Sequence, residues 1–157
     1  MKLDHLAYRV DDRKAAADFM VKQLGYLIVD NFHLDFDDGT VADCYALSKD
    51  GETDIFISQG QAGSVAAQWV EDNGGVGGIH HIAYRVPSVA TTMKNWMENN
   101  VAEFTTPQPI VGVNLVQAFT KPHPLTGVTY ELIERDEGVI GFEPENVKRL
   151  MESTKNL

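Results

Sequence analysis

The feature that most constrains the fold of this chain is a strand-like segment that occurs twice. Residues 79–86, IHHIAYRV, repeat residues 3–10, LDHLAYRV: five of the eight positions are identical, and two more exchange one aliphatic residue for another. The second copy begins near the middle of the 157-residue chain. Internal similarity of this kind is typical of a duplicated structural unit. The sequence therefore predicts two halves with the same fold.

Each copy of the repeated strand is followed by the same succession of predicted elements. Residues 13–24 carry apolar side chains at helical spacing and stop before Gly25, a residue type that commonly ends helices. In the second half, Ser88 can cap a helix that begins at Val89. Three strand-like segments follow each helix, at residues 26–32, 41–48 and 53–58 in the first half and at 102–107, 114–121 and 128–134 in the second. Both halves therefore have the order βαβββ.

Additional segments join and follow the two modules. A short helix capped by Ser64 precedes a glycine-rich loop, and Pro144 marks the start of a last helix. We therefore predict an α+β protein with four segments: a first module at 1–59, a linker at 60–76, a second module at 77–135 and a C-terminal helical segment at 136–157.

The composition argues against several kinds of partner. Asp and Glu number 23 against 13 Lys and Arg, which gives a net charge of -10, and nucleic acids and anionic membranes prefer basic surfaces. The single cysteine, Cys44, excludes an internal disulfide and favours a reducing compartment. No apolar run approaches the roughly 20 residues of a membrane span, and we expect no signal segment before the first strand. We expect a cytoplasmic globular protein.

The two repeated strands each place a histidine on their less apolar face. Strand side chains alternate between faces, so His5 and His81 lie opposite the aliphatic and tyrosine side chains that should pack on a helix. His80 points with the apolar set and is the less favoured ligand. The faces that carry His5 and His81 must line something else.

Glu131 is the third unusual residue. It lies within the apolar strand VTYELIE, where a carboxylate is costly unless it is paired or binds a metal. By the repeat, we expect its counterpart in the first half to be Ile55. His5, His81 and Glu131 together offer two neutral nitrogens and one anionic oxygen, the donors of a two-histidine, one-carboxylate facial triad. Strand histidines and a strand glutamate also occur as ordinary structural residues, so this pattern alone leaves both readings open.

The paired βαβββ halves, with a histidine on each first strand and a glutamate on the last, resemble the vicinal oxygen chelate superfamily. That superfamily includes glyoxalase I, methylmalonyl-CoA epimerase, extradiol dioxygenases and fosfomycin- or bleomycin-resistance proteins. The resemblance implies that both modules form one cup-shaped, eight-stranded mixed β barrel of glyoxalase-like fold around a divalent metal. It implies that His5, His81 and Glu131 hold this metal.

Within the superfamily, the chain is most similar to the catalytic half of 4-hydroxyphenylpyruvate dioxygenase. The similarity is carried by residues 64–86, 114–122 and 129–154. It implies an Fe(II)-dependent dioxygenase acting on a 2-oxo acid, with Co, Mn, Zn or Ni as other metals that the ligands could hold. It also implies that Gln117 and Phe119 face the substrate, that Phe142 is an aromatic residue of a lid formed by the C-terminal helix, and that Asp43 and Gln59 stand near the substrate.

Two other functions remain open from the sequence. Epimerases and glyoxalases carry a fourth protein ligand, Gln or Glu, at the position where this chain is expected to have Ile55. Isoleucine cannot bind a metal, so this difference favours the dioxygenase. Gln59 lies close enough in the sequence to keep a metal-dependent epimerase, isomerase or lyase as the alternative. A small-molecule-sequestering protein of the resistance type is the third candidate. Because the two halves are self-similar, pairing of modules in a homodimer is a further expectation.

Overall fold

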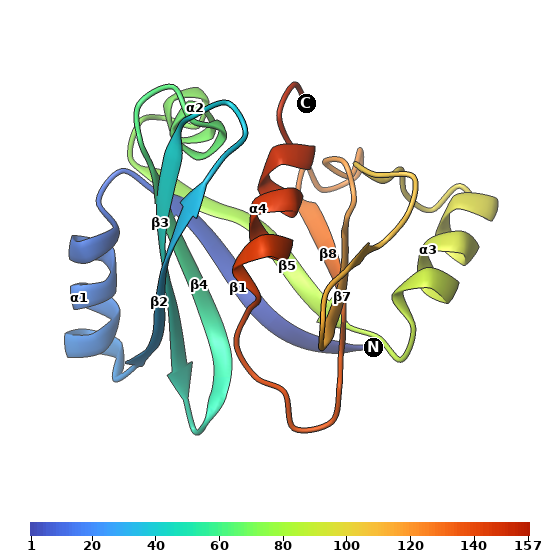
Figure 1. Ribbon diagram of the computed structural model, residues 1–157, viewed down its shortest axis with the longest axis horizontal. Coiled ribbons are helices and arrows are strands. Elements are labelled where there is room, and N and C mark those ends of the chain that lie inside the picture. The colour runs from blue at the N-terminus through green and yellow to red at the C-terminus, as the bar shows by residue number, and fades with distance from the viewer. The chain divides into compact units, whose positions relative to one another are not determined.

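The structure of the chain is a computed structural model that describes residues 1–157, apart from the side chains of Glu52 and Thr53. The chain divides into two compact units (Figure 1). One comprises His5–His80, and the other comprises Met1–Asp4 together with His81–Leu157. The boundaries therefore fall inside the two repeated strands, directly before each of the two candidate histidines.

The unit His5–His80 contains the first βαβββ module and a short additional helix. Its elements are β1 (Lys2–Val10, which begins in the other unit), α1 (Arg13–Leu24), β2 (Leu27–Asp35), β3 (Val41–Lys49), β4 (Glu52–Gly60) and α2 (Val65–Asp72). The strand order is β2-β3-β4-β1, with β1 parallel to β4 and the other pairs antiparallel. Ala17 and Met20 of α1 pack on Leu47, Ile55 and Ile57 of the sheet.

Local signals at both ends explain the bounds of α1. The Asp12 side chain accepts a hydrogen bond of 2.9 Å from the backbone N–H of Ala15, which caps the first turn. The backbone of Gly25 adopts the left-handed conformation, with φ 77°, and ends the helix. The predicted helix over 13–24 is thus confirmed.

The other unit contains the second module and the last helix. Its elements are β5 (Gly77–Arg85, which begins in the first unit), α3 (Val89–Glu98), β6 (Ile110–Val111), β7 (Leu115–Phe119), β8 (Thr129–Arg135) and α4 (Pro144–Ser153). The strand order is β5-β8-β7-β6, and β5 is parallel to β8. Ser88 caps α3 as predicted, and Val89 and Met93 of this helix pack on Leu132.

The predicted strand at 102–107 is wrong. This segment forms only an isolated bridge between Phe104 and Thr120, and the strand that pairs with β7 is Ile110–Val111. Pro107 and Pro109 lack the N–H that a continuous ladder requires, so the chain crosses this region as a loop and pairs only after the second proline.

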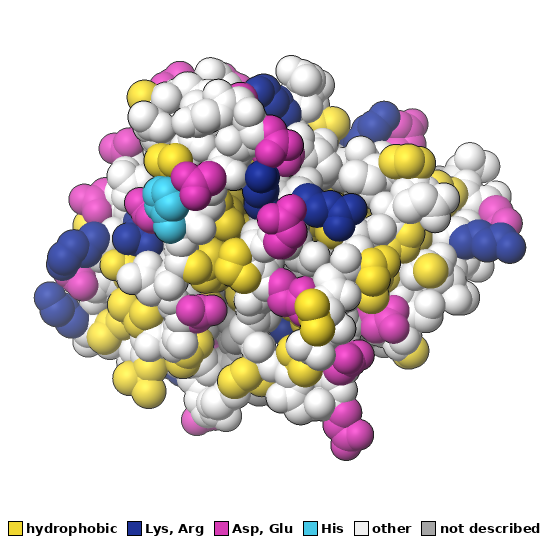
Figure 2. All heavy atoms as spheres, in the orientation of Figure 1, with side chains coloured by type: hydrophobic (Ala, Val, Ile, Leu, Met, Phe, Trp, Pro, Cys, Tyr) yellow, Lys and Arg dark blue, Asp and Glu magenta, His cyan; other side chains and the backbone are white. Residues whose placement is uncertain are grey.

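The described chain therefore has the α+β class and the two βαβββ modules that the repeat predicts. Acidic side chains are spread over the face shown in Figure 2, with lysine and arginine side chains between them. In the part of the chain that the structure describes, every helix is too short or too polar to cross a membrane.

Candidate metal centre

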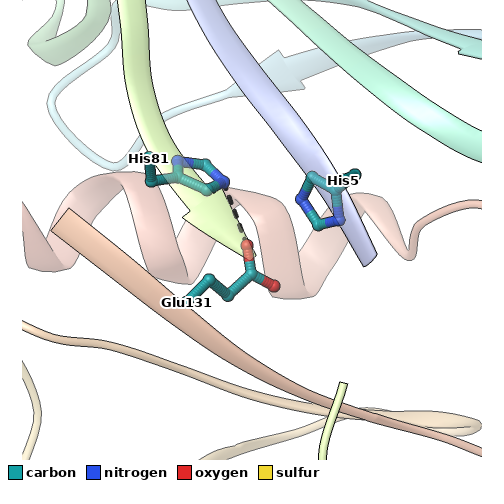
Figure 3. Close-up of side chains that lie close together, drawn as sticks. All are labelled: His5, His81 and Glu131. Atoms are coloured by element: carbon teal, nitrogen blue, oxygen red, sulfur yellow. Dashed lines mark ion pairs between the residues drawn. The ribbon is translucent and has the colours of Figure 1, made fainter. Parts of the chain in front are cut away.

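His81 and Glu131 form the best-defined part of the candidate site. His81 lies on β5 and Glu131 on the adjacent parallel strand β8, and both are buried. The Nε2 atom of His81 is 3.0 Å from Oε2 of Glu131 (Figure 3). The ring nitrogen can donate an N–H to the carboxylate oxygen, or, in the other tautomer, present a lone pair that binds a cation together with that oxygen. The chemistry of the pair therefore fits a divalent metal as well as a proton.

His5 is the third member of the group of potential metal ligands. It directly follows Asp4 on β1, and Asp4 binds Arg85 and Arg135 within the unit that contains His81 and Glu131. His5, His81 and Glu131 each offer one ligand atom, a ring nitrogen or a carboxylate oxygen, and Figure 3 shows the three side chains. Two neutral imidazoles and one carboxylate, all buried, are a suitable donor set for a divalent transition metal.

The neighbouring histidine, His80, has a different environment. Its ring stands edge-on to the indole of Trp69 in α2, with centroids 5.3 Å apart. This contact places His80 on the opposite face of β5 from His81, as the alternation of strand side chains predicts. His80 is therefore a packing residue.

The strand registers correct one detail of the repeat. Glu131 on β8 lies opposite Ala83 of β5, whereas the equivalent Ala7 of β1 lies opposite Phe56 of β4. The counterpart of Glu131 is therefore Phe56, and the assignment of Ile55 was wrong by one residue. A shift of one residue reverses the face of the sheet, and Ile55 accordingly packs against α1. Neither side chain can bind a metal, so the first module still lacks a ligand at this position.

Gln117 and Phe119, both on β7, lie beside the candidate ligands. Gln117 donates a hydrogen bond of 2.7 Å from Nε2 to Oε1 of Glu131. The ring centroid of Phe119 is 4.5 Å from that of His81. The resemblance implied that both residues face the substrate, and this stays a prediction; in the structure both ends of the Gln117 amide have protein partners.

Asn146 is a residue that the sequence analysis missed. Its Nδ2 atom donates to Oε1 of Gln117 at 3.1 Å, so Asn146 is one hydrogen bond removed from the partner of Glu131. The signal was present in the sequence: Asn146 stands four residues before Leu150, on the buried face of α4. A polar residue on a buried helix face needs a partner, and here that partner is at the candidate site.

The structure gives the remaining predicted residues other contacts. The Asp43 carboxylate lies 2.8 Å from the ring nitrogen Nδ1 of His33, and about half of each side chain is exposed. The side-chain oxygen of Gln59 accepts a hydrogen bond of 2.9 Å from the backbone N–H of Arg13, at the start of α1. The ring of Phe142 lies 5.4 Å from the Arg135 guanidinium carbon. Asp43 is outside the group of potential metal ligands, and Gln59 accepts a backbone hydrogen bond at the start of α1; the place of both residues near a substrate stays a prediction.

Comparison with solved structures shows where this fold occurs. The chain superimposes on a triple mutant of 4-hydroxymandelate synthase from Streptomyces coelicolor with a TM-score of 0.81 and 18% sequence identity. The superposition covers 98% of the present chain and 53% of the synthase chain. The chain thus spans about half of that protein. Methylmalonyl-CoA epimerase from Mycobacterium tuberculosis gives a TM-score of 0.69 and 22% identity, covering 86% of this chain and 88% of that chain. These identities show a shared fold.

Sequence comparison assigns the family. No curated protein sequence matches this chain. A family model described as the Glyoxalase/Bleomycin resistance protein/Dioxygenase superfamily matches residues 4–114, which include His5, His81 and most of both modules. With the βαβββ duplication, this match leads to one conclusion: the chain belongs to the Glyoxalase/Bleomycin resistance protein/Dioxygenase superfamily.

Proposed function

We propose that this protein is a non-haem Fe(II)-dependent dioxygenase that acts on a 2-oxo acid related to 4-hydroxyphenylpyruvate. The observation that carries the proposal is the donor set of His5, His81 and Glu131, without a fourth protein ligand at Phe56. Three protein ligands leave open coordination positions, which a chelating substrate and dioxygen both require. The superfamily to which the chain belongs includes dioxygenases by its description, which supports this class of enzyme.

In this proposal His5, His81 and Glu131 hold the ferrous ion. When bound, the ion supplies the redox chemistry by which a 2-oxo acid reacts with dioxygen. The reaction consumes one dioxygen and releases one carbon dioxide: one oxygen atom enters the new carboxylate, and the other enters the organic product. Loss of carbon dioxide provides two of the four electrons that reduce dioxygen, and hydroxylation provides the other two.

The residues around the ligands have separate tasks. Phe119, buried against the His81 ring, holds that ring in orientation and keeps water from it. Gln117 fixes the Glu131 carboxylate through its amide. Phe142, which lies just before α4 and beside Arg135, is proposed to contact the apolar body of the substrate.

The test is an anaerobic titration. Protein loaded with ferrous iron should give a saturable charge-transfer band when 4-hydroxyphenylpyruvate is added, and admission of air should then consume oxygen and release carbon dioxide. His81→Ala and Glu131→Ala should lose the iron and the band. His80→Ala is the matched control, because it removes the adjacent imidazole, which packs on Trp69, and should keep both. Full iron content and activity in His81→Ala would refute the proposal.

A metal-dependent epimerase is the second candidate. It is favoured by one observation: the chain shares its fold with methylmalonyl-CoA epimerase from Mycobacterium tuberculosis, at a TM-score of 0.69 and 22% identity. An epimerase needs no oxygen. Exchange of a substrate proton with solvent under anaerobic conditions, with cobalt or manganese bound and no charge-transfer band with any 2-oxo acid, would select this function.

A further inference from the structure

The Gln117 amide connects two parts of the second module. Its Nε2 atom donates to Glu131 at 2.7 Å, and its Oε1 atom accepts from Nδ2 of Asn146 at 3.1 Å. Only 1% of Gln117 and 2% of Asn146 is exposed, so water competes with neither bond. A continuous hydrogen-bonded chain therefore runs from α4 through β7 to the carboxylate on β8.

The direction of these bonds follows from a third contact. Nδ2 of Asn146 also faces the backbone carbonyl of Leu115, at 3.4 Å. A carbonyl oxygen only accepts, so Asn146 must direct its NH₂ group to this side and donate its second hydrogen to Gln117. Gln117 must then present its oxygen to Asn146 and its NH₂ group to Glu131. The network therefore has one consistent orientation, in which a hydrogen-bond donor faces the carboxylate.

The Glu131 carboxylate is bound on both sides. Oε1 accepts the hydrogen bond from Gln117, and Oε2 faces Nε2 of His81 at 3.0 Å. The Gln117 bond thus restrains rotation of the carboxylate and leaves Oε2 directed to the imidazole. Residues that hydrogen-bond to a ligand in this way commonly determine how well the ligand is oriented for its metal.

The helix α4 is fixed to the same module at its start and its end. The Glu143 carboxylate accepts backbone hydrogen bonds from Val113 at 2.8 Å and Asn114 at 2.6 Å, in the turn between β6 and β7. The Ser153 hydroxyl lies 2.9 Å from the Thr105 hydroxyl. These contacts hold α4 where Asn146 reaches Gln117.

We infer that Gln117 and Asn146 are positioning residues that orient Glu131 for metal binding and couple that binding to the attachment of α4. The inference rests on the proposed function only in that Glu131 is a metal ligand. Coupling between two sites is reciprocal. Removal of the Asn146 amide should weaken metal binding, and metal binding should protect the backbone of α4 from exchange.

The test measures metal affinity and hydrogen exchange, without turnover. Co(II) affinity is determined by competition with a chromophoric chelator for the wild type, Gln117→Leu and Asn146→Leu. Loss of an outer-shell partner typically reduces metal affinity about 10- to 100-fold, and we expect this range for both variants. Amide exchange in α4 should slow on metal binding in the wild type and stay unchanged in Gln117→Leu. Circular dichroism checks that each variant is folded. If Gln117→Leu does not fold, Asn146→Leu still provides the test, because Asn146 lies in α4 and not in the sheet.

Ser153→Ala is the matched control, because it removes another attachment of α4 without touching the Gln117 network. It should speed exchange near the end of α4 and keep the Co(II) affinity. If the wild type binds Co(II) and both leucine variants bind it equally well, the positioning role is overturned while the proposed function stands. If the wild type binds no divalent metal, both are overturned.

Discussion

Arg135 on β8 binds both carboxylate oxygens of Asp4, the residue that precedes His5. Its Nε atom donates to Oδ2 and its Nη2 atom donates to Oδ1, each at 2.9 Å, and both side chains are almost fully buried. Arg85 makes a second ion pair with the same carboxylate, at 2.8 Å. Paired hydrogen bonds of this kind fix direction as well as distance. Asp4 therefore holds the segment of β1 that leads directly into a candidate metal ligand.

Replacement of Asp4 by Asn should destabilise the protein strongly. The change preserves shape but leaves the buried Arg135 without its counter-charge, a situation that typically costs about 3–5 kcal/mol. Urea unfolding followed by circular dichroism measures the loss. The control is Asp18→Asn, which removes an exposed partner of Lys14 and should leave the unfolding midpoint in place. Equal midpoints for the two variants would contradict the structural role of Asp4.

The sequence was sufficient for features that depend on local signals. The Ser88 cap and the Gly25 terminus were predicted correctly because each is determined by the conformation of a few adjacent residues. The choice of His81 over His80 followed from strand alternation alone, and the contact of His80 with Trp69 agrees with it.

Features that depend on pairing between distant segments were not predictable in the same way. The counterpart of Glu131 in the first module is Phe56 and not Ile55 because of the register between β1 and β4. This register cannot be derived from the sequence pattern alone. The contact between Asn146 and Gln117 joins residues 29 positions apart. The patterns placed both residues on regular elements, but only the packing of α4 on β7 brings them together.

Gly77 at the start of β5 should not tolerate a side chain. Its φ of 110° lies in a region that L-residues rarely adopt, and a Cβ atom there would collide with the backbone oxygen of Arg9. We expect Gly77→Ala to destabilise the protein by more than about 2 kcal/mol, measured by thermal and urea unfolding. Gly78→Ala is the matched control, because a Cβ at Gly78 has no neighbour within 4 Å. The prediction fails if the two variants unfold alike.

The single cysteine should be unreactive in the folded protein. Cys44 lies on β3 with no exposed surface, and burial raises the pKa of its thiol because the thiolate would lose its solvation. Reaction with a thiol reagent at pH 8 should be at least about 100-fold slower in the native protein than in urea, since it requires an opening of the sheet. Native and unfolded chains that react at similar rates would show that this part of β3 opens readily.

The pair of His33 and Asp43 should produce a pH-dependent contribution to stability. The hydrogen bond to Asp43, with the charges of Asp43 and Asp35, raises the pKa of His33 above its usual value of 6.5. Because the pKa is higher in the folded state than in the unfolded state, the stabilisation is complete below the unfolded pKa. It is lost as the pH rises through the folded pKa.

The measurement that checks this pair is an NMR titration of the His33 ring protons. Asp43→Asn removes the largest cause of the shift, so the midpoint should fall toward 6.5. Asp30→Asn serves as the control, because the Asp30 carboxylate binds the backbone N–H of Asn31 and is not a partner of His33. This variant should leave the midpoint where it is. A midpoint that does not respond to Asp43→Asn would show that the cross-strand pair does not form in solution, and Asp43 would then be available for another partner.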